Sequence, residues 1–232
     1  MTPTAVTTGI DDAGRATTRI EYDGTIPRPP LGGSLAFLLL SFPLGIAWFV
    51  MLVTLISVGV GTAVVWVGLA VLALAVLGWR GGAQVERARV YALLDTVIAN
   101  PYRALPAGSQ GPRWKARLRD PQTWRDLAYL FVLFPLGIVE FTLVVASWGY
   151  GIGLATLPIH YRWLPDGAWH FPSWHPDARW FTVDSVVDAL PWAALGVVMI
   201  GFAVALTRWL AGTHARFARW LLGPRGQAVV AG

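Results

Sequence analysis

Long apolar runs alternate with short charged segments along the chain, and this alternation predicts membrane-spanning helices. No charged side chain occurs from Leu31 to Trp79. A bilayer core about 30 Å thick is crossed by roughly 20 helical residues, so this run accommodates two spans, at about 35–58 and 62–78, joined by a tight hairpin. Further apolar runs at about 127–148 and 190–208 predict a third and a fourth span.

Composition supports the membrane class. Hydrophobic residues make up 55% of the 232 residues and charged residues only 13%. A soluble protein of this size would lack the polar side chains needed to cover its surface. We therefore expect an all-α, polytopic membrane protein with four transmembrane helices.

One pentapeptide occurs twice. Phe42-Pro-Leu-Gly-Ile46 returns as Phe134-Pro-Leu-Gly-Ile138, 92 positions later, and a Gly-X-Gly step at 59–61 recurs at 151–153 with the same offset. A fixed offset indicates a duplicated unit. Because two spans return the chain to the same side, we expect two tandem, like-oriented repeats, about 34–100 and 120–224, related by an axis along the membrane normal.

The repeated step also suggests how the first and third spans pack. Pro43 and Pro135 each remove a helix hydrogen bond, which favours a kink. Gly45 and Gly137 lack side-chain bulk and would let a neighbouring helix approach closely.

Charged segments flank the spans. The residues at 84–98 and 212–222 have amphipathic spacing, which predicts two cytoplasmic surface helices. Residues 106–112 are typical of a loop, and the basic residues at 113–119 suit contact with anionic headgroups. Asp120 and Pro121 then form a helix start, with an N-cap acid followed by proline at the first helical position.

The charge distribution predicts the topology. Between Trp79 and Leu127 the sequence has nine Lys/Arg and four acids, whereas the insert at about 158–188 has more acids than basic residues. The positive-inside rule therefore places both termini in the cytoplasm and the insert outside the cell membrane. Since the basic excess has this explanation, no nucleic acid partner is expected. The ends, 1–33 and 225–232, are expected to be tails, the first of them disordered.

Few residues are candidates for chemistry. Glu140 lies within the third span, where a carboxyl costs about 2.5–3.5 kcal/mol, so it is a candidate ligand contact or protonatable switch, or a hydrogen-bonded packing acid. The outer insert adds candidate ligand-binding residues, which are His160, His170, His175, Trp169 and Trp174. These aromatic rings equally suit an interfacial belt.

Neither metal, cofactor nor enzymatic chemistry is predicted. The histidine spacing matches no compact metal motif, the chain has no cysteine, and no Gly-X-Ser-X-Gly nucleophile motif is present.

Three motifs together resemble a known family. They are Ser41-Phe-Pro-Leu-Gly-Ile-Ala-Trp-Phe49, Glu86-Arg-Ala-Arg89 before Leu93-Leu94, and Asp120-Pro-Gln-Thr-Trp-Arg-Asp-Leu127 leading into the second Phe-Pro-Leu-Gly step. This combination, over residues 34–224, resembles the putative sensor domain family, which is found at the N-terminal end of some bacterial histidine kinases and as stand-alone membrane proteins. The resemblance implies signal perception. The chain ends at Gly232 without a kinase domain, so signalling output would require a partner.

The sequence thus favours a non-catalytic membrane sensor of a bacterial two-component system. It would perceive an extracellular or intramembrane cue and relay it to a cytoplasmic or membrane partner such as a histidine kinase. The alternative is an accessory subunit or small permease of a transport system, for which a transporter component would be the partner. The lipid bilayer is an expected partner in both cases, and a homo-oligomer stays open.

Overall fold

Four long helices form the protein. The computed structural model describes residues 3–10, 16–22, 30–102, 106, 108–164, 167–171 and 180–224. The long helices are α1 (Leu31–Gly61), α2 (Val67–Leu94), α4 (Pro121–Ala155) and α6 (Val186–Leu222). Each is long and apolar enough to cross a membrane. The predicted all-α, polytopic membrane class is confirmed.

Short elements connect and flank these helices. They are η1 (Ala63–Val65), α3 (Gln110–Arg119), α5 (Leu157–His160) and η2 (Tyr161–Trp163), with strands β3 (Trp169–Phe171) and β4 (Phe181–Val183) paired antiparallel. Near the N-terminus, β1 (Pro3–Ile10) and β2 (Ala16–Tyr22) form an antiparallel hairpin, in a segment where we expected no regular structure.

The helix-start signal before the third span is confirmed. Pro121 is the first residue of α4, and the Asp120 side chain accepts a hydrogen bond from the backbone N–H of Gln122 at 3.0 Å. The acid thereby satisfies one of the amide groups that have no partner within a first helical turn.

The two segments predicted as separate surface helices are instead the ends of spans. Helix α2 continues through residues 84–94, and α6 continues through residues 212–222. Several polar side chains of these segments are buried against other helices, among them Glu86, Arg89 and His214. Amphipathic spacing indicates only that two faces differ, and here polar residues are buried together with apolar ones such as Val90 and Leu94. Helix α3 covers the last part of the loop expected at 106–112 and the basic residues at 113–119.

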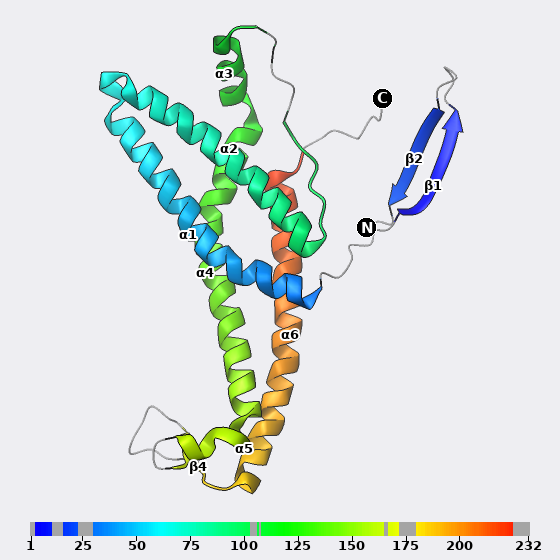
Figure 1. Ribbon diagram of the computed structural model, residues 1–232, viewed down its shortest axis with the longest axis vertical. Coiled ribbons are helices and arrows are strands. Elements are labelled where there is room, and N and C mark those ends of the chain that lie inside the picture. The colour runs from blue at the N-terminus through cyan, green and yellow to red at the C-terminus, as the bar shows by residue number, and fades with distance from the viewer. Residues whose placement is uncertain are drawn as a thin grey trace.

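The orientation of the two repeated helices differs from the expectation. Phe42 of α1 stacks on Phe141 of α4, and Phe49 stacks on Phe134, with ring centroids 4.9 and 4.6 Å apart. The order of residues is therefore reversed between the two helices, and α1 and α4 run in opposite directions where they cross (Figure 1). The expected symmetry axis along the helices is wrong, since these contacts are related by an axis perpendicular to both.

The repeated glycines explain this crossing. A Cβ atom on Gly45 would lie 2.9 Å from the Leu133 carbonyl oxygen, and one on Gly137 would lie 2.6 Å from the Ser41 carbonyl oxygen. Each glycine therefore receives the partner helix backbone, and the two contacts interlock. Counting spans fixes the side on which a helix begins, but it does not fix the angle at which two hairpins cross.

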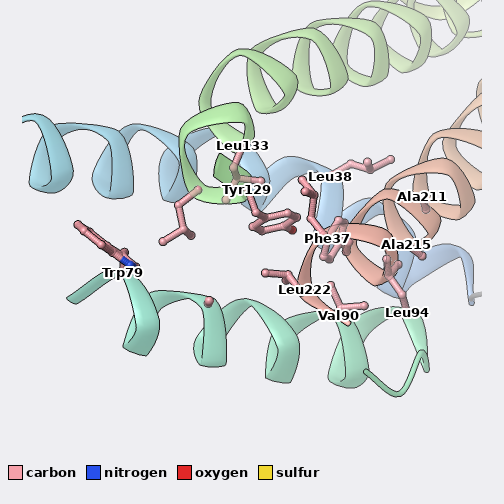
Figure 2. Close-up of a cluster of buried hydrophobic side chains, with 14 of the residues drawn as sticks. Phe37, Leu38, Trp79, Val90, Leu94, Tyr129, Leu133, Ala211, Ala215 and Leu222 are labelled. Atoms are coloured by element: carbon pink, nitrogen blue, oxygen red, sulfur yellow. The ribbon is translucent and has the colours of Figure 1, made fainter. Parts of the chain in front are cut away.

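The buried core lies where the open ends of the two hairpins meet. Figure 2 shows Phe37 and Leu38 of α1, Val90 of α2 and Tyr129 of α4 converging with the end of α6. Away from this junction the hairpin tips point apart, as Figure 1 shows, and Val64 and Trp66 at one tip are exposed. Apolar side chains on the outer faces are also exposed, including Val50, Leu74, Val139 and Val198. Lipid is the solvent that suits such faces.

The interlocked crossing predicts opposite effects for two alanine substitutions in α4. Gly137→Ala should destabilise the protein by about 1–3 kcal/mol, because its methyl group collides with the α1 backbone. The control Gly149→Ala, where nothing lies within 4 Å of the added carbon, should be neutral or stabilising by up to about 1 kcal/mol. Unfolding in mixed detergent micelles, followed by tryptophan fluorescence, measures both, and equal stabilities would contradict the crossing.

Candidate functional site

A line of buried polar side chains joins all four long helices. We call it the central polar chain, and it consists of Ser41, Arg89, Glu86, Tyr129, His214 and Glu140. It begins at α1 and α2. The Arg89 guanidinium donates to Glu86 Oε2 through Nη2 at 2.7 Å and through Nε at 3.0 Å. Its Nη1 donates to the Phe37 carbonyl at 3.0 Å and to Ser41 Oγ at 3.2 Å.

The chain continues into α4 and α6. The Tyr129 hydroxyl lies 3.5 Å from Glu86 Oε2 and 3.0 Å from His214 Nε2. The other ring nitrogen of His214, Nδ1, lies 2.8 and 3.0 Å from the two oxygens of Glu140. Glu140 is 2% exposed and His214 is 1% exposed, so water reaches neither group in this conformation.

Helical spacing brings these groups together. Glu86 and Arg89 are three residues apart on α2, so their side chains lie on one face. Phe37 packs edge-on against the His214 ring with centroids 4.7 Å apart, and its ring also lies 4.0 Å beneath the Arg89 guanidinium. The Phe37 ring therefore holds both the Arg89 guanidinium and the His214 imidazole, which is a cation when protonated, from the α1 side.

Each hairpin has a polar contact between its two helices, but the acidic residue lies on a different helix of the hairpin in each case. In the first hairpin, Trp48 of α1 donates to Glu86 of α2 at 3.4 Å. In the second, Glu140 of α4, 92 positions after Trp48, meets His214 of α6 at 2.8 Å. The acid stands on the second helix of one hairpin and on the first helix of the other.

A second group, the helix-end cluster, consists of Arg87, Tyr102, Gln122 and Asp126. Arg87 Nη2 donates to Asp126 Oδ1 at 2.7 Å, and Arg87 Nε donates to the Leu222 carbonyl at 3.1 Å. Gln122 donates to Asp126 at 2.9 Å and to the Leu221 carbonyl at 3.0 Å. The cluster thereby fixes the C-terminal end of α6, whose last carbonyls have no partner within the helix.

Tyr102 closes the helix-end cluster from the segment after α2. Its hydroxyl donates to Asp126 Oδ2 at 2.5 Å, and the Arg80 guanidinium lies 3.9 Å from its ring centroid. Burial, together with the hydrogen bond and charge of Asp126, raises the pKa of Tyr102 to about 12, although Arg87 opposes the shift. The phenol is therefore protonated, and so a donor, at every physiological pH.

These arrangements suit coupling between helices better than bond-making chemistry. Removing one partner from a buried ion pair leaves an uncompensated charge and costs about 3–5 kcal/mol. The relative positions of α1, α2, α4 and α6 are consequently linked through the polar chain. Among the described residues, no group of three or more His, Cys, Asp or Glu side chains is positioned to hold a metal ion.

The predicted site residues are distributed over different parts of the fold. Glu140 lies in the central polar chain, and Gly45 and Gly137 lie at the crossing of α1 and α4. Helices α1 and α4 continue through Pro43 and Pro135.

Those outer candidates that the structure describes have partners outside the central polar chain. His160 contacts the Thr156 carbonyl at 2.8 Å, and His170 contacts Thr182 Oγ1 at 3.2 Å. Trp169 packs on Trp192 with ring centroids 4.9 Å apart. Trp174 and His175 lie outside the described residues.

Sequence reasoning assigned no partner to Glu140 and missed residues of both polar groups. His214, Tyr129 and Asp126 received no role, although each stands within or beside a predicted span. A signal was present, because ionisable and hydrogen-bonding residues in such segments normally face the interior of a bundle. Pairing them required the helix crossing, which the sequence did not supply.

The buried ion pair predicts strongly non-additive stabilities. Arg89→Met should destabilise the protein by about 3–5 kcal/mol, because Glu86 then remains charged without its partner. The double variant Glu86→Gln with Arg89→Met should recover most of that loss. A double-mutant cycle in detergent unfolding measures the coupling energy, and simple additivity would contradict the pair.

The raised pKa of Tyr102 predicts a loss of stability at alkaline pH. Because its pKa is raised to about 12 in the folded protein and is about 10 unfolded, its stabilising contribution is complete below about pH 10 and declines as the pH rises through 12. Subtracting the tyrosinate absorbance titration of Tyr102→Phe from that of the wild type should show one phenol ionising near pH 12. A difference curve centred near pH 10 would contradict the assigned environment.

The similarity of this chain to known proteins is seen at the level of a family. No curated protein and no solved structure matches the chain significantly. One family model, described as "Putative sensor", matches residues 37–222. The matched region contains the α1–α4 crossing, the central polar chain and the helix-end cluster. The chain therefore belongs to the family described as "Putative sensor".

Proposed function

We propose that this protein is a non-catalytic, integral membrane sensor that perceives an extracellular or intramembrane cue and relays it to a cytoplasmic partner. Membership of the sensor family supports a sensing or signalling role and points to a non-enzymatic one. The positive-inside distribution supports a cell-membrane location with both termini in the cytoplasm. In this topology the ends of α2 and α6 face the partner, for which a histidine kinase is the leading candidate.

The central polar chain is the observation that carries this proposal. A sensor needs an element with two arrangements whose balance a stimulus can change. Hydrogen-bonded side chains from four helices supply such an element, because altering one bond changes the partners available to the next. The central polar chain runs from Glu140, within a span, to Arg89, near the end of α2. It therefore connects the membrane interior with the predicted cytoplasmic end.

A transport role is the alternative, and the same residues bear on it. Polar groups lining a path through the bilayer would favour an accessory subunit or small permease. In this protein, however, Glu86, Tyr129 and His214 satisfy one another by direct contacts of 3.5 and 3.0 Å. Direct contacts favour a packed coupling element over the lining of a water-filled path.

Site-specific photo-crosslinking in the native host tests the relay. A crosslinking amino acid at Lys115, which is exposed on α3, should capture a cytoplasmic regulatory protein, whereas the same group at Val64 on the predicted outer tip should not. Arg89→Met should change the yield at Lys115 at least severalfold, because it disrupts the polar chain without touching the crosslinking surface. A transporter ATPase captured at Lys115 would favour the transport alternative, and a yield unaffected by Arg89→Met would contradict the relay.

A further inference from the structure

We propose that Glu140 and His214 form a binding site for one proton inside the helix bundle, and that release of this proton redirects the hydrogen bonds linking α6 to α2. The inference deepens the proposed sensing role, because it names the proton as the cue that the central polar chain detects. It rests on the charges around the pair and on the directions in which each group can donate.

The first step is a charge count around the pair. From α2, Glu86 and Arg89 face the site and neutralise each other at 2.7 Å. From α4, Tyr129 and Glu140 face it, and α1 contributes only the non-titrating Phe37 and Ser41. The neighbouring pair of Arg87 and Asp126 is also neutral as a unit.

Glu140 is therefore left with a partner whose charge is not permanent. Among the described residues, its hydrogen-bonded partner is His214, which is cationic only when protonated. A lone ionised carboxylate is costly in a buried, low-dielectric site. One proton, held either on His214 Nδ1 or on a Glu140 oxygen, makes the whole group neutral, and both placements use the same 2.8 Å contact.

The second step follows the donors when this proton is bound. In both placements His214 Nε2 carries a hydrogen and donates to the Tyr129 oxygen at 3.0 Å. The Tyr129 hydroxyl hydrogen is then free to point to Glu86 Oε2, 3.5 Å away. Donation therefore runs in one direction, from α6 through α4 to α2.

The third step follows the donors after the proton leaves to bulk water. The ionised Glu140 then requires a donor, so the single hydrogen of neutral His214 must reside on Nδ1. Nε2 becomes an acceptor, and the Tyr129 hydroxyl turns to donate to it. Glu86 on α2 loses the Tyr129 donor and keeps those of Arg89 and Trp48. Loss of one proton thus removes the polar link between α2 and α6 that passes through Tyr129.

The stability of the purified full chain in lipid nanodiscs tests the binding of the proton. Because the proposed site holds a proton that the unfolded chain does not need, stability should fall as the pH is raised. The wild-type Tm should therefore decrease as the pH is raised from neutral to alkaline values. Glu140→Gln removes the need for a proton and should abolish this drop, whereas the control His160→Gln should retain it.

A rescue experiment covers the variant that could fail to fold. His214→Gln leaves the carboxylate without its partner and should lower the Tm strongly. Adding Glu140→Gln to it should restore stability and remove the pH dependence. If the two substitutions are additive, or if Glu140→Gln retains the wild-type pH slope, the proposed site is overturned.

Nitrogen-15 NMR of histidine reads the hydrogen-bond reversal directly. Replacing His160, His170 and His175 by Gln leaves His214 as the one labelled imidazole. Raising the pH should leave a hydrogen on Nδ1 and remove the one on Nε2, and Tyr129→Phe should leave the proton bound at low pH while removing the hydroxyl that changes its acceptor. A tautomer that stays unchanged would overturn the proposal. Neither the stability measurement nor the NMR measurement uses a signalling readout. A failure of the proton-site proposal is therefore distinguishable from a failure of the relay that the crosslinking experiment tests.

Discussion

A charge placed in a low-dielectric interior must be neutralised by its immediate neighbours, and this requirement determines how the helices of this protein meet. Helix α2 carries Glu86, Arg87 and Arg89 into the bundle, where each lies at or below 8% exposure. Their partners come from α1, α4, α6 and the segment containing Tyr102. Apolar helices in lipid have little hydrophobic reason to choose one neighbour over another, so these directed contacts supply much of the specificity.

Packing at the crossing of α1 and α4 complements the polar contacts. Gly45 and Gly137 bring the two backbones together, and phenylalanine pairs stack between the two helices on either side of the crossing. The same five-residue step thus serves both helices. The chemistry around the crossing is nevertheless unequal, because Trp48 and Glu140 hold equivalent positions in the repeat and only one of them can ionise.

The sequence predicts well what depends on local pattern. Four spans follow from hydropathy, and the start of α4 follows from Asp120 and Pro121. It predicts poorly what depends on contacts between distant segments. The continuity of α2 past Gly82 could not be foreseen, because the environment that makes a polar helix face stable there is built by α4 and α6. For the same reason Glu140 could be singled out by its cost in a span, whereas His214, 74 residues away, could not be assigned to it.

The concentration of packing at one junction gives the helices mechanical leverage. From Gly137 at the crossing to Ala155 at the end of α4 the helix extends about 27 Å, at 1.5 Å per residue. A rotation of only about 5° at the junction would therefore carry that end through roughly 2 Å. A small change of angle at the junction is in this way enlarged at the distant end of the helix.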